Sequence, residues 1–412
     1  MTTDDRDAEA SALDAADPLR TYRDRYVGAE TPLVYFDGNS LGRPLRVTAE
    51  RIASFVADEW GGRLIRAWDE TWMQLPYTLG DALGAAVLGA GPGQTVVGDS
   101  TTVLLYKLVR AALDAQQARD PSRVELVVDT GNFPTDRYVV EGIAAERGGR
   151  VRWIEVDRAA GVDAGLLAAA VGPETAVVVL SHVAYRSGYM ADGAALTAIA
   201  RDAGALMLWD LCHSAGSVPV HLDAWGADLA VGCTYKYLGG GPGSPAFAYV
   251  AERHQHALTQ PIQGWMGTAE VFAMGPEYVP GPGMQRFLSG TPPILAMQPL
   301  RDSVAVIAEA GIDAIRAKSI ALTQYAASLA DELLAPFGVT LASPADPALR
   351  GGHLTLSHPA MRAVTARLWD QDVIPDYRDP DGLRIGLAPL SVSFAEVLRG
   401  MRAVAEAVRD TT

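Results

Sequence analysis

Between Val96 and Val250 the sequence alternates short apolar runs with Ala-rich stretches of helical spacing, and this alternation limits the possible folds more than any other feature. The apolar runs are continuous and rich in β-branched residues: VELVVD, VRWIEVD, TAVVVLSH, ALMLWD and ADLAVGC. Strands of this kind are buried on both faces, as in a mostly parallel sheet covered by helices on each side. The pattern therefore predicts an α/β fold with a doubly wound, mostly parallel sheet.

The segment after Pro299 has a different pattern. A long Ala-rich helical stretch runs to about Ala335, and VTLAS, HLTLSH, LRIGLAP and a last helix from Phe394 follow. This segment of roughly 110 residues predicts a smaller C-terminal α+β domain. We expect an N-terminal arm (1–45) that joins the small domain, a large cofactor-binding domain (46–300) and the small domain (301–412).

Composition limits the partners of the chain. Its 34 basic and 49 acidic residues give a net charge of −15, which disfavours nucleic acid and anionic membrane surfaces. Two cysteines are too few for a disulfide framework, and the N-terminus lacks the basic-then-apolar order of a signal peptide. No apolar run reaches the roughly 18 residues that span a bilayer. We expect a cytoplasmic protein with no nucleic-acid or membrane partner.

Several familiar catalytic motifs are missing. The sequence contains no G-x-S-x-G elbow, no G-x-x-x-x-G-K-[ST] loop and no G-x-G-x-x-G after the first strand pattern. Its histidines and cysteines show no metal-ligand spacing, so we expect no metal. Serine hydrolase, P-loop and Rossmann interpretations therefore lose their main support.

An acid and a lysine follow two neighbouring apolar runs. ALMLWD ends at Asp210, and ADLAVGC leads to Tyr235 and Lys236 just before a glycine run. Ligands of open α/β sheets bind at the carboxyl ends of the strands, so we expect both side chains at the same edge. The pair suits pyridoxal phosphate, which takes a lysine for its Schiff base and a carboxylate beside its pyridine nitrogen. A surface ion pair at a strand end would have the same spacing.

The segment GDSTTVLLYKLVRAAL offers a place for the phosphate group. Ser100, Thr101 and Thr102 directly precede apolar positions with helical spacing. Hydroxyl and free N–H groups at a helix N-terminus bind phosphate without a net positive charge. Ordinary capping of the helix is the alternative.

Eight motifs follow one another in order, and they belong to a resemblance that covers about residues 35 to 390. They are DGNSLG (37–42), DSTTVLLYK (99–107), NFPTDRY (132–138), SHVAYRSGYM (181–190), WDLCHSAG (209–216), TYKYLGGGPG (234–243), GWMG (264–267) and SGTPPI (289–294). Together they resemble the kynureninases, which are aminotransferase-like pyridoxal phosphate enzymes of fold type I. The resemblance implies this fold and pyridoxal 5'-phosphate attached to Lys236.

The resemblance also implies a role for each matching residue. Lys236 would form the Schiff base, Asp210 would pair with the pyridine nitrogen, and Tyr235 would contact the phosphate and donate a proton. The other implied cofactor contacts are Thr101, Thr102, Phe133, Thr135, Asp136, Ser181 and His213, with Trp265 and Thr291 reaching the cofactor of the opposite subunit. A homodimer with two shared active sites is implied in this way.

The implied reaction is the hydrolysis of the Cβ–Cγ bond of L-kynurenine or 3-hydroxykynurenine, which gives an anthranilate and L-alanine. Lys236 would act as the base at Cα, and Asn39 and Ser40 would lie near the substrate. Arg384 would bind the α-carboxylate, for which a planar bidentate donor is well suited. The pathway is either tryptophan catabolism, leading towards NAD biosynthesis, or a dedicated biosynthetic route.

The sequence departs from the family at two positions. Met266 and Thr268 stand where an aromatic residue and a histidine are usual, in the expected substrate pocket. Because methionine is flexible, we expect a pocket that tolerates a ring-substituted kynurenine. Neutral drift is the alternative for Thr268.

Other functions remain open at this point. A different fold type I lyase or transaminase is one, although no cysteine follows Cys233 to serve as a desulfurase nucleophile. A non-enzymatic binding protein with this fold is another, and it predicts the loss of Lys236, Asp210 or Arg384, all of which are present.

Overall fold

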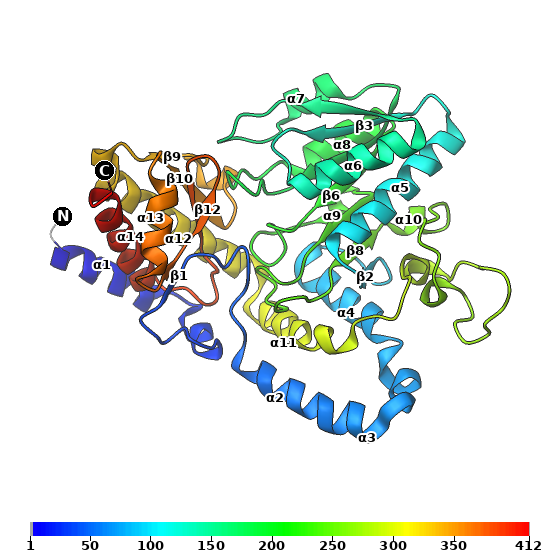
Figure 1. Ribbon diagram of the computed structural model, residues 1–412, viewed down its shortest axis with the longest axis horizontal. Helices are drawn as coiled ribbons and strands as arrows, with labels where there is room; N and C mark the ends of the chain where they lie inside the picture. Colours follow the sequence, from blue (N-terminus) through cyan, green and yellow to red (C-terminus); the bar gives the residue numbers. More distant parts are fainter. Residues whose placement is uncertain (1–2, 412) are drawn as a thin grey trace.

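A seven-stranded sheet in the order β2-β8-β7-β6-β5-β3-β4 forms the centre of the larger part of the molecule (Figure 1). The structure is a computed structural model and describes residues 3–411. The strands are β2 (Thr95–Val97), β3 (Glu125–Asp129), β4 (Arg150–Ile154), β5 (Thr175–Ser181), β6 (Leu206–Asp210), β7 (Leu229–Gly232) and β8 (Phe247–Val250). The five strands β3, β4, β5, β6 and β7 run parallel to one another, and β8 is antiparallel to both of its neighbours, β2 and β7. The predicted mostly parallel sheet is confirmed.

The strands of this sheet are buried on both faces because alternate side chains enter two different cores. On β5, Val177 and Val179 pack in one core with α5 (Thr101–Arg119) and α6 (Pro134–Arg147). Val178 and Leu180 pack in the other core, with α8 (Gly193–Asp202) and α11 (Ile294–Ala310). This two-sided burial explains the continuous apolar runs of the sequence.

The parallel strands bring distant parts of the chain to one edge of the sheet. The strands β3, β5, β6 and β7 all end at this edge. The segments that follow Asp129, Ser181, Asp210 and Gly232 therefore start side by side.

A four-stranded antiparallel sheet in the order β12-β13-β10-β9 forms the centre of the smaller part. Its strands are β9 (Thr340–Leu341), β10 (His353–Ser357), β12 (Asp376–Arg378) and β13 (Gly382–Gly386). Its helices are α12 (Ile312–Leu333), α13 (Met361–Trp369) and α14 (Phe394–Arg409). The register of β13 places Arg384 opposite Asp376 on one side and Thr355 on the other.

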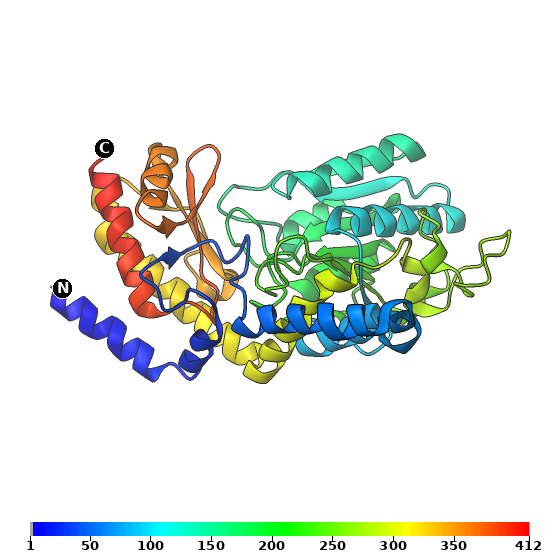
Figure 2. The same ribbon diagram turned by 60° about the horizontal axis from the view of Figure 1, so that its bottom comes forward.

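The N-terminal segment packs on the smaller part. Helix α1 (Thr3–Ala16) lies against α14, as Figures 1 and 2 both show, and β1 (Val34–Tyr35) pairs with β11 (Val373–Ile374). Figure 2 also shows α2 (Arg46–Ser54) running along the larger part, where it packs on α11. The domain boundaries after residues 45 and 300 stay a prediction.

The Ala-rich stretch that predicts one long helix forms two. Helix α11 contains Pro299 and ends at Ala310, and α12 begins at Ile312. Gly311 between them has a φ of 78°, a left-handed conformation that glycine adopts without steric cost. The remaining α-helices are α3 (Gly61–Arg63), α4 (Leu75–Leu83), α7 (Ala164–Ala170), α9 (Leu222–Trp225) and α10 (Glu252–Gln255).

None of the helices within residues 3–411 is both long enough and apolar enough to cross a bilayer.

Candidate active site

Lys236 differs from the two other lysines of the chain in its surroundings. Lys107 and Lys318 are buried and form ion pairs of 2.6 Å and 2.7 Å with aspartates. Within residues 3–411, Lys236 has no carboxylate at ion-pair distance, and its Nζ lies 3.0 Å from His213 Nε2. An amine held by an imidazole rather than by a carboxylate is available for covalent chemistry.

Two carboxyl groups lie close to this lysine. Asp210 is the last residue of β6, and its Oδ1 accepts a hydrogen bond from Cys212 N at 2.8 Å. Asp136 lies in the first turn of α6, and its buried Oδ2 has no partner in the described part of the chain. Burial and the neighbouring charge of Asp210 raise the pKa of Asp136, whereas Lys236 opposes this shift. An unpaired carboxyl oxygen in so buried a position fits a site that receives a polar ligand.

The edge of the sheet beside Asp210 carries a small hydrogen-bond network. Ser181, the last residue of β5, donates to Asn132 Oδ1 at 2.8 Å and lies 3.3 Å from Asp210 Oδ2. The same Asn132 oxygen accepts from Phe133 N at 2.7 Å. Asn132 is buried and was not singled out from the sequence, although it opens the NFPTDRY motif. It fixes the backbone from which Phe133 projects.

Phe133 presents an aromatic ring near the lysine. The ring is 37% exposed, packs edge-on against Tyr185 at 5.3 Å between centroids, and has Lys236 Nζ 6.0 Å from its centroid. A partly exposed ring this close to a reactive amine can stack on a planar ligand. Thr135 follows in the first turn of α6.

The N-terminus of α5 is the candidate phosphate site. Thr101 and Thr102 are its first two residues, and Ser100 caps the helix by accepting from Val103 N at 3.4 Å. Cys212 Sγ lies 4.0 Å from Thr101 Oγ1, so this terminus adjoins the segment after β6. The first N–H groups of a helix, together with these hydroxyls, favour an anion.

The chain before Lys236 is held by the DGNSLG loop. Gly42 N donates to Tyr235 O at 2.8 Å, and a Cβ at Gly42 would come within 2.5 Å of Lys236 O. Glycine is therefore required for this close approach. Burial and the nearby Cys233 thiol raise the pKa of the Tyr235 phenol, which keeps it protonated at neutral pH. Cys233 and Cys212 contact each other through Cys233 N and Cys212 Sγ at 3.2 Å.

Arg384 is 1% exposed and already makes several contacts. Its Nη1 donates to Tyr185 O at 2.7 Å, and its Nη2 donates to Ser40 Oγ at 2.7 Å and to Asp376 Oδ2 at 2.5 Å. With the Asn39 amide turned so that its oxygen faces the guanidinium, that oxygen accepts from Arg384 Nε at 2.9 Å. A substrate carboxylate would have to take the place of one of these partners.

Asp37 is a second acid beside this arginine. Its Oδ1 lies 3.9 Å from Arg384 Nη2. Burial raises the pKa of Asp37 to about 6, while the hydrogen bond with Ser40 acts in the opposite direction. Neither Asp37 nor Asp376 was singled out from the sequence; Asp37 opens the DGNSLG motif, whereas only strand register brings Asp376 here.

Four predicted residues lie apart from this cluster. Trp265 packs edge-on against Phe272 at 6.2 Å, and Thr291 is exposed. Met266 is fully buried in the core that contains α5, and Thr268 Oγ1 donates to Val279 O at 3.0 Å. Within residues 3–411, no hydrogen bond, ion pair or ring contact joins any of them to Lys236 of the same chain. The prediction that Met266 and Thr268 belong to a pocket that tolerates a ring-substituted kynurenine stays a prediction.

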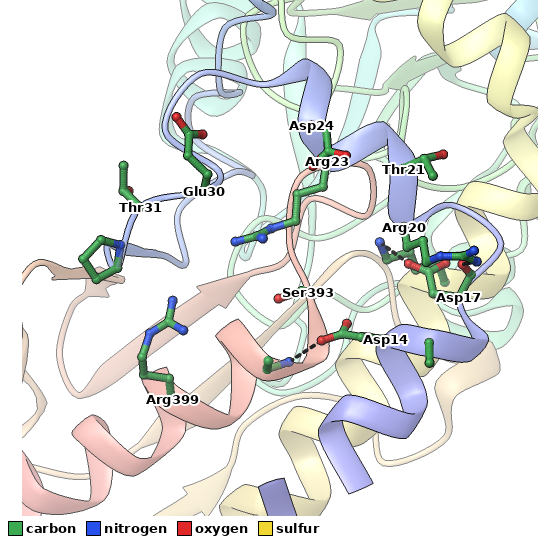
Figure 3. Close-up of a pocket in the computed structure, with 14 residues that line it drawn as sticks. Asp14, Asp17, Arg20, Thr21, Arg23, Asp24, Glu30, Thr31, Ser393 and Arg399 are labelled. Atoms are coloured by element: carbon green, nitrogen blue, oxygen red, sulfur yellow. Dashed lines mark hydrogen bonds and ion pairs between the residues drawn. The ribbon is translucent and has the colours of Figure 1, made fainter. Parts of the chain in front are cut away.

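A cavity of about 780 Å³ lies elsewhere, between the N-terminal segment and α14. Figure 3 shows charged side chains of both signs on its walls, and Asp14 capping α14 by accepting from Phe394 N at 2.8 Å. None of the residues around Lys236 lines this cavity, so it is separate from the candidate active site. In the described part of the chain, no three His, Cys, Asp or Glu side chains are grouped as metal ligands.

Comparison with known proteins gives matches over most of the chain. Residues 86–358 match the class-V aminotransferase family, and residues 315–404 match the kynureninase C-terminal domain. The chain is 42% identical to the kynureninase of Pseudomonas fluorescens over 399 residues, which are 96% of this chain and 94% of that protein. It is 43% identical to the kynureninase of Burkholderia pseudomallei (strain 1106a) over 392 residues, 94% of this chain and 92% of the relative.

Solved structures show the same fold at lower identity. A mutant of C-DES with glycine covalently linked to its pyridoxal phosphate cofactor superposes with a TM-score of 0.82 at 21% identity, over 93% of this chain and 99% of that one. The apo cysteine desulfurase of Thermococcus onnurineus NA1 gives a TM-score of 0.79 at 19% identity, over 97% and 98%. At these identities the likeness concerns the fold alone.

Proposed function

The chain belongs to the kynureninase family, and we propose that the residues around Lys236 carry out the hydrolysis of the Cβ–Cγ bond of a kynurenine. It is a pyridoxal phosphate-dependent enzyme that releases an anthranilate and alanine. The observation that carries the assignment of residues is that Lys236 has no carboxylate partner, whereas the two other lysines each have one.

The residues near Lys236 fit the cofactor. Lys236 Nζ would hold it covalently, the Asp210 carboxylate would keep a proton on the ring nitrogen, and Phe133 would lie against the ring. The phosphate would bind at the start of α5, to Thr101, Thr102 and the first N–H groups of the helix. The Oδ2 atom of Asp136, which has no partner in the described part of the chain, supports a polar ligand beside Asp210. When bound, pyridoxal phosphate supplies an electron sink for charge that develops on the substrate carbons.

The other steps belong to side chains of the protein. Lys236 Nζ would move the proton at the substrate Cα, since it is the amine nearest the cluster and has no carboxylate partner in residues 3–411. Tyr235 would donate a proton to the departing Cβ, because burial holds its pKa above the ordinary value and keeps the phenol protonated. Ser181 and His213 would orient the carboxylate and the amine that they contact.

Arg384 would bind the substrate α-carboxylate, with Asn39 and Ser40 beside it. Its guanidinium is buried and bonded to Asp376, so the substrate carboxylate would replace an existing anion and bring little new desolvation cost.

The substrate ring would be that of kynurenine, 3-hydroxykynurenine or a ring-methylated relative. The alternative is an enzyme specialised for a kynurenine with a substituted ring, and the threonine at position 268 supports it.

We also propose an oligomeric state, a cellular compartment and a pathway for the chain. The chain would act as a cytoplasmic homodimer in which Trp265 and Thr291 complete the site of the partner subunit. Exposed apolar side chains around Trp265, at Phe272, Met274 and Val279, support an interface there. Its place would be in the kynurenine pathway, either in tryptophan catabolism towards NAD or in a biosynthetic route.

Borohydride trapping tests the assignment of Lys236. Reduction of the yellow purified protein, followed by peptide mapping, is expected to find the cofactor on Lys236. The variant Lys236→Ala should lose both the yellow absorbance and the release of fluorescent anthranilate. Lys318→Arg, which keeps the charge paired with Asp17, is the matched control and should retain both. Cofactor trapped on Lys107 or Lys318, or full activity in Lys236→Ala, would contradict the proposal.

A further inference from the structure

Two buried histidines from different sheets meet beside Lys236. His213 follows β6 of the large sheet, and His353 is the first residue of β10 in the small sheet. Their ring centroids lie 5.3 Å apart with the planes inclined by 56°. His213 Nδ1 and both ring nitrogens of His353 have no hydrogen-bond partner of normal geometry in the described part of the chain. Three unpaired polar atoms therefore gather at one internal point.

Such a cluster needs an explanation. A buried donor or acceptor without a partner costs free energy, and nearly all such groups in native proteins bond to protein or to an internal water. Further polar atoms adjoin the pair, because a Cβ at Gly352, the neighbour of His353, would come within 2.3 Å of Ser217 Oγ and 2.7 Å of Tyr237 Oη. An internal water with several polar neighbours is the ordinary solution for this arrangement.

The contact with Lys236 fixes the protonation of His213. A protonated lysine only donates hydrogen bonds, so His213 Nε2, 3.0 Å away, accepts. Burial and the positive charges of Lys236 and Arg384 lower the pKa of His213 and keep the ring neutral. The proton of the neutral ring is then on Nδ1, which is the nitrogen without a partner. This N–H group requires an acceptor.

His353 can supply that acceptor. Burial and the charges of Arg384, Lys236 and Arg378 lower the pKa of His353, so its ring is neutral and has one accepting nitrogen. Its other nitrogen lies near the Tyr185 carbonyl without forming a hydrogen bond of normal geometry. The same carbonyl accepts from Arg384 Nη1 at 2.7 Å. Polar contacts therefore join Arg384 to Tyr185 and His213 to Lys236, and His353 lies between these two pairs without a direct polar contact to His213.

We propose that His353 is a positioning residue that, through one internal water, holds His213 in the tautomer that presents Nε2 to Lys236. The inference rests on the proposed function, because it concerns the lysine that takes the cofactor. Without His353, His213 Nδ1–H has no acceptor, and the opposite tautomer would turn an N–H group towards the lysine ammonium. The ammonium form of Lys236 would then be less stable.

The rate at which the cofactor-free protein takes up pyridoxal phosphate tests this inference, since only the neutral amine reacts. The pH midpoint of this rate, followed by absorbance, is the quantity compared between variants. His353→Phe, which has no ring nitrogens, is expected to lower the midpoint by about one pH unit, the size of one lost hydrogen bond. His353→Gln keeps a donor and an acceptor and should stay close to the wild-type midpoint.

Leu356→Ala is the matched control, because Leu356 is fully buried on the same strand but lies in the core of the small part. It should lower the melting temperature without moving the midpoint. A folded His353→Phe variant with the wild-type midpoint would overturn the inference. So would a high-resolution wild-type crystal structure without a water between His213 Nδ1 and His353, which is decisive even if the variant does not fold. Failure of the wild-type protein to attach the cofactor at Lys236 would instead contradict the proposed function.

Discussion

At the scale of single residues, two carboxyl groups lie beside the buried guanidinium of Arg384. Arg384 is balanced by Asp376 at 2.5 Å and by Asp37 at 3.9 Å before any substrate binds. Its buried charge is thereby neutralised, and a buried guanidinium left without an anion would be costly. We therefore expect the protonation of Asp37 to change how strongly Arg384 attracts a further carboxylate.

Asp37 should make substrate affinity depend on pH. Its pKa of about 6 lies above the ordinary value because it is buried, so the carboxyl is neutral below pH 6 and charged above it. The charged form competes with the substrate carboxylate for Arg384. We expect KM of the wild type, divided by KM of Asp37→Asn, to rise by about threefold to tenfold between pH 5.5 and 7.5. Steady-state kinetics across this range measure the ratio.

The control for this experiment is Asp381→Asn, which removes a half-exposed carboxylate that pairs with Arg186 in the same part of the molecule. The other charges that face Asp37 are Asp376, Arg378 and Arg384, and they are the same in both variants. If the ratio of the wild-type KM to the Asp37→Asn KM does not change with pH, Asp37 does not titrate in this range.

At the scale of elements, the close approach of helix to strand depends on glycine. Gly80 lies inside α4 where this helix packs on β2, and a Cβ there would come within 2.3 Å of Thr95 O. Because Thr95 O is a backbone atom of β2, it cannot avoid the new Cβ by a change of rotamer. Gly142 lies inside α6, is exposed, and has no heavy atom within 4 Å of the position of a Cβ.

The two glycines should respond in opposite directions to alanine. Gly80→Ala is expected to destabilise the protein by about 1–3 kcal/mol because the helix must move away from β2. Gly142→Ala should stabilise it by about 0.5–1 kcal/mol, because alanine has the better helix propensity and nothing clashes. Melting temperatures of both variants measured against the wild type check the signs. An unchanged melting temperature for Gly80→Ala would contradict the packing described here.

At the scale of the whole molecule, the reactive lysine lies where the two sheets meet. The large sheet contributes Asp210, His213 and Lys236, whereas the small sheet contributes His353 and Arg384. Under the proposed assignment, the substrate would bind at Arg384 on one part of the chain and react at Lys236 on the other.

The proposed homodimer predicts complementation between inactive subunits. Lys236→Ala removes the lysine of one site, and Thr291→Ala weakens the contribution to the partner's site. A hybrid of the two variants has one intact site, so random mixing should restore about a quarter of the wild-type activity. Activity after mixing, with each variant alone as control, measures this. A mixture no more active than its components, in a protein that sediments as a dimer, would show that the sites are not shared.

Much of the fold follows from local pattern. The continuous apolar runs predict β3, β5, β6 and β7 within a residue or two, because burial on both faces selects β-branched residues along the whole strand. The sequence does not predict the break at Gly311, because the Ala-rich pattern continues across it. It also does not predict how short β9 is, because VTLAS is typical of a strand longer than the two residues that pair. Helix propensity does not by itself show where a helix ends.

The sequence by itself determined that Asp210 and Lys236 lie at one edge of a parallel sheet, because strand direction fixes which ends meet. It also determined the motif order that identifies the family. Only the tertiary structure decided that Asp376 neutralises Arg384, that Asp136 is buried beside Asp210, and that His353 meets His213. These contacts join residues far apart in the chain, and they depend on strand register and on the packing of two sheets. Many weak interactions fix that packing together, and no local pattern records them.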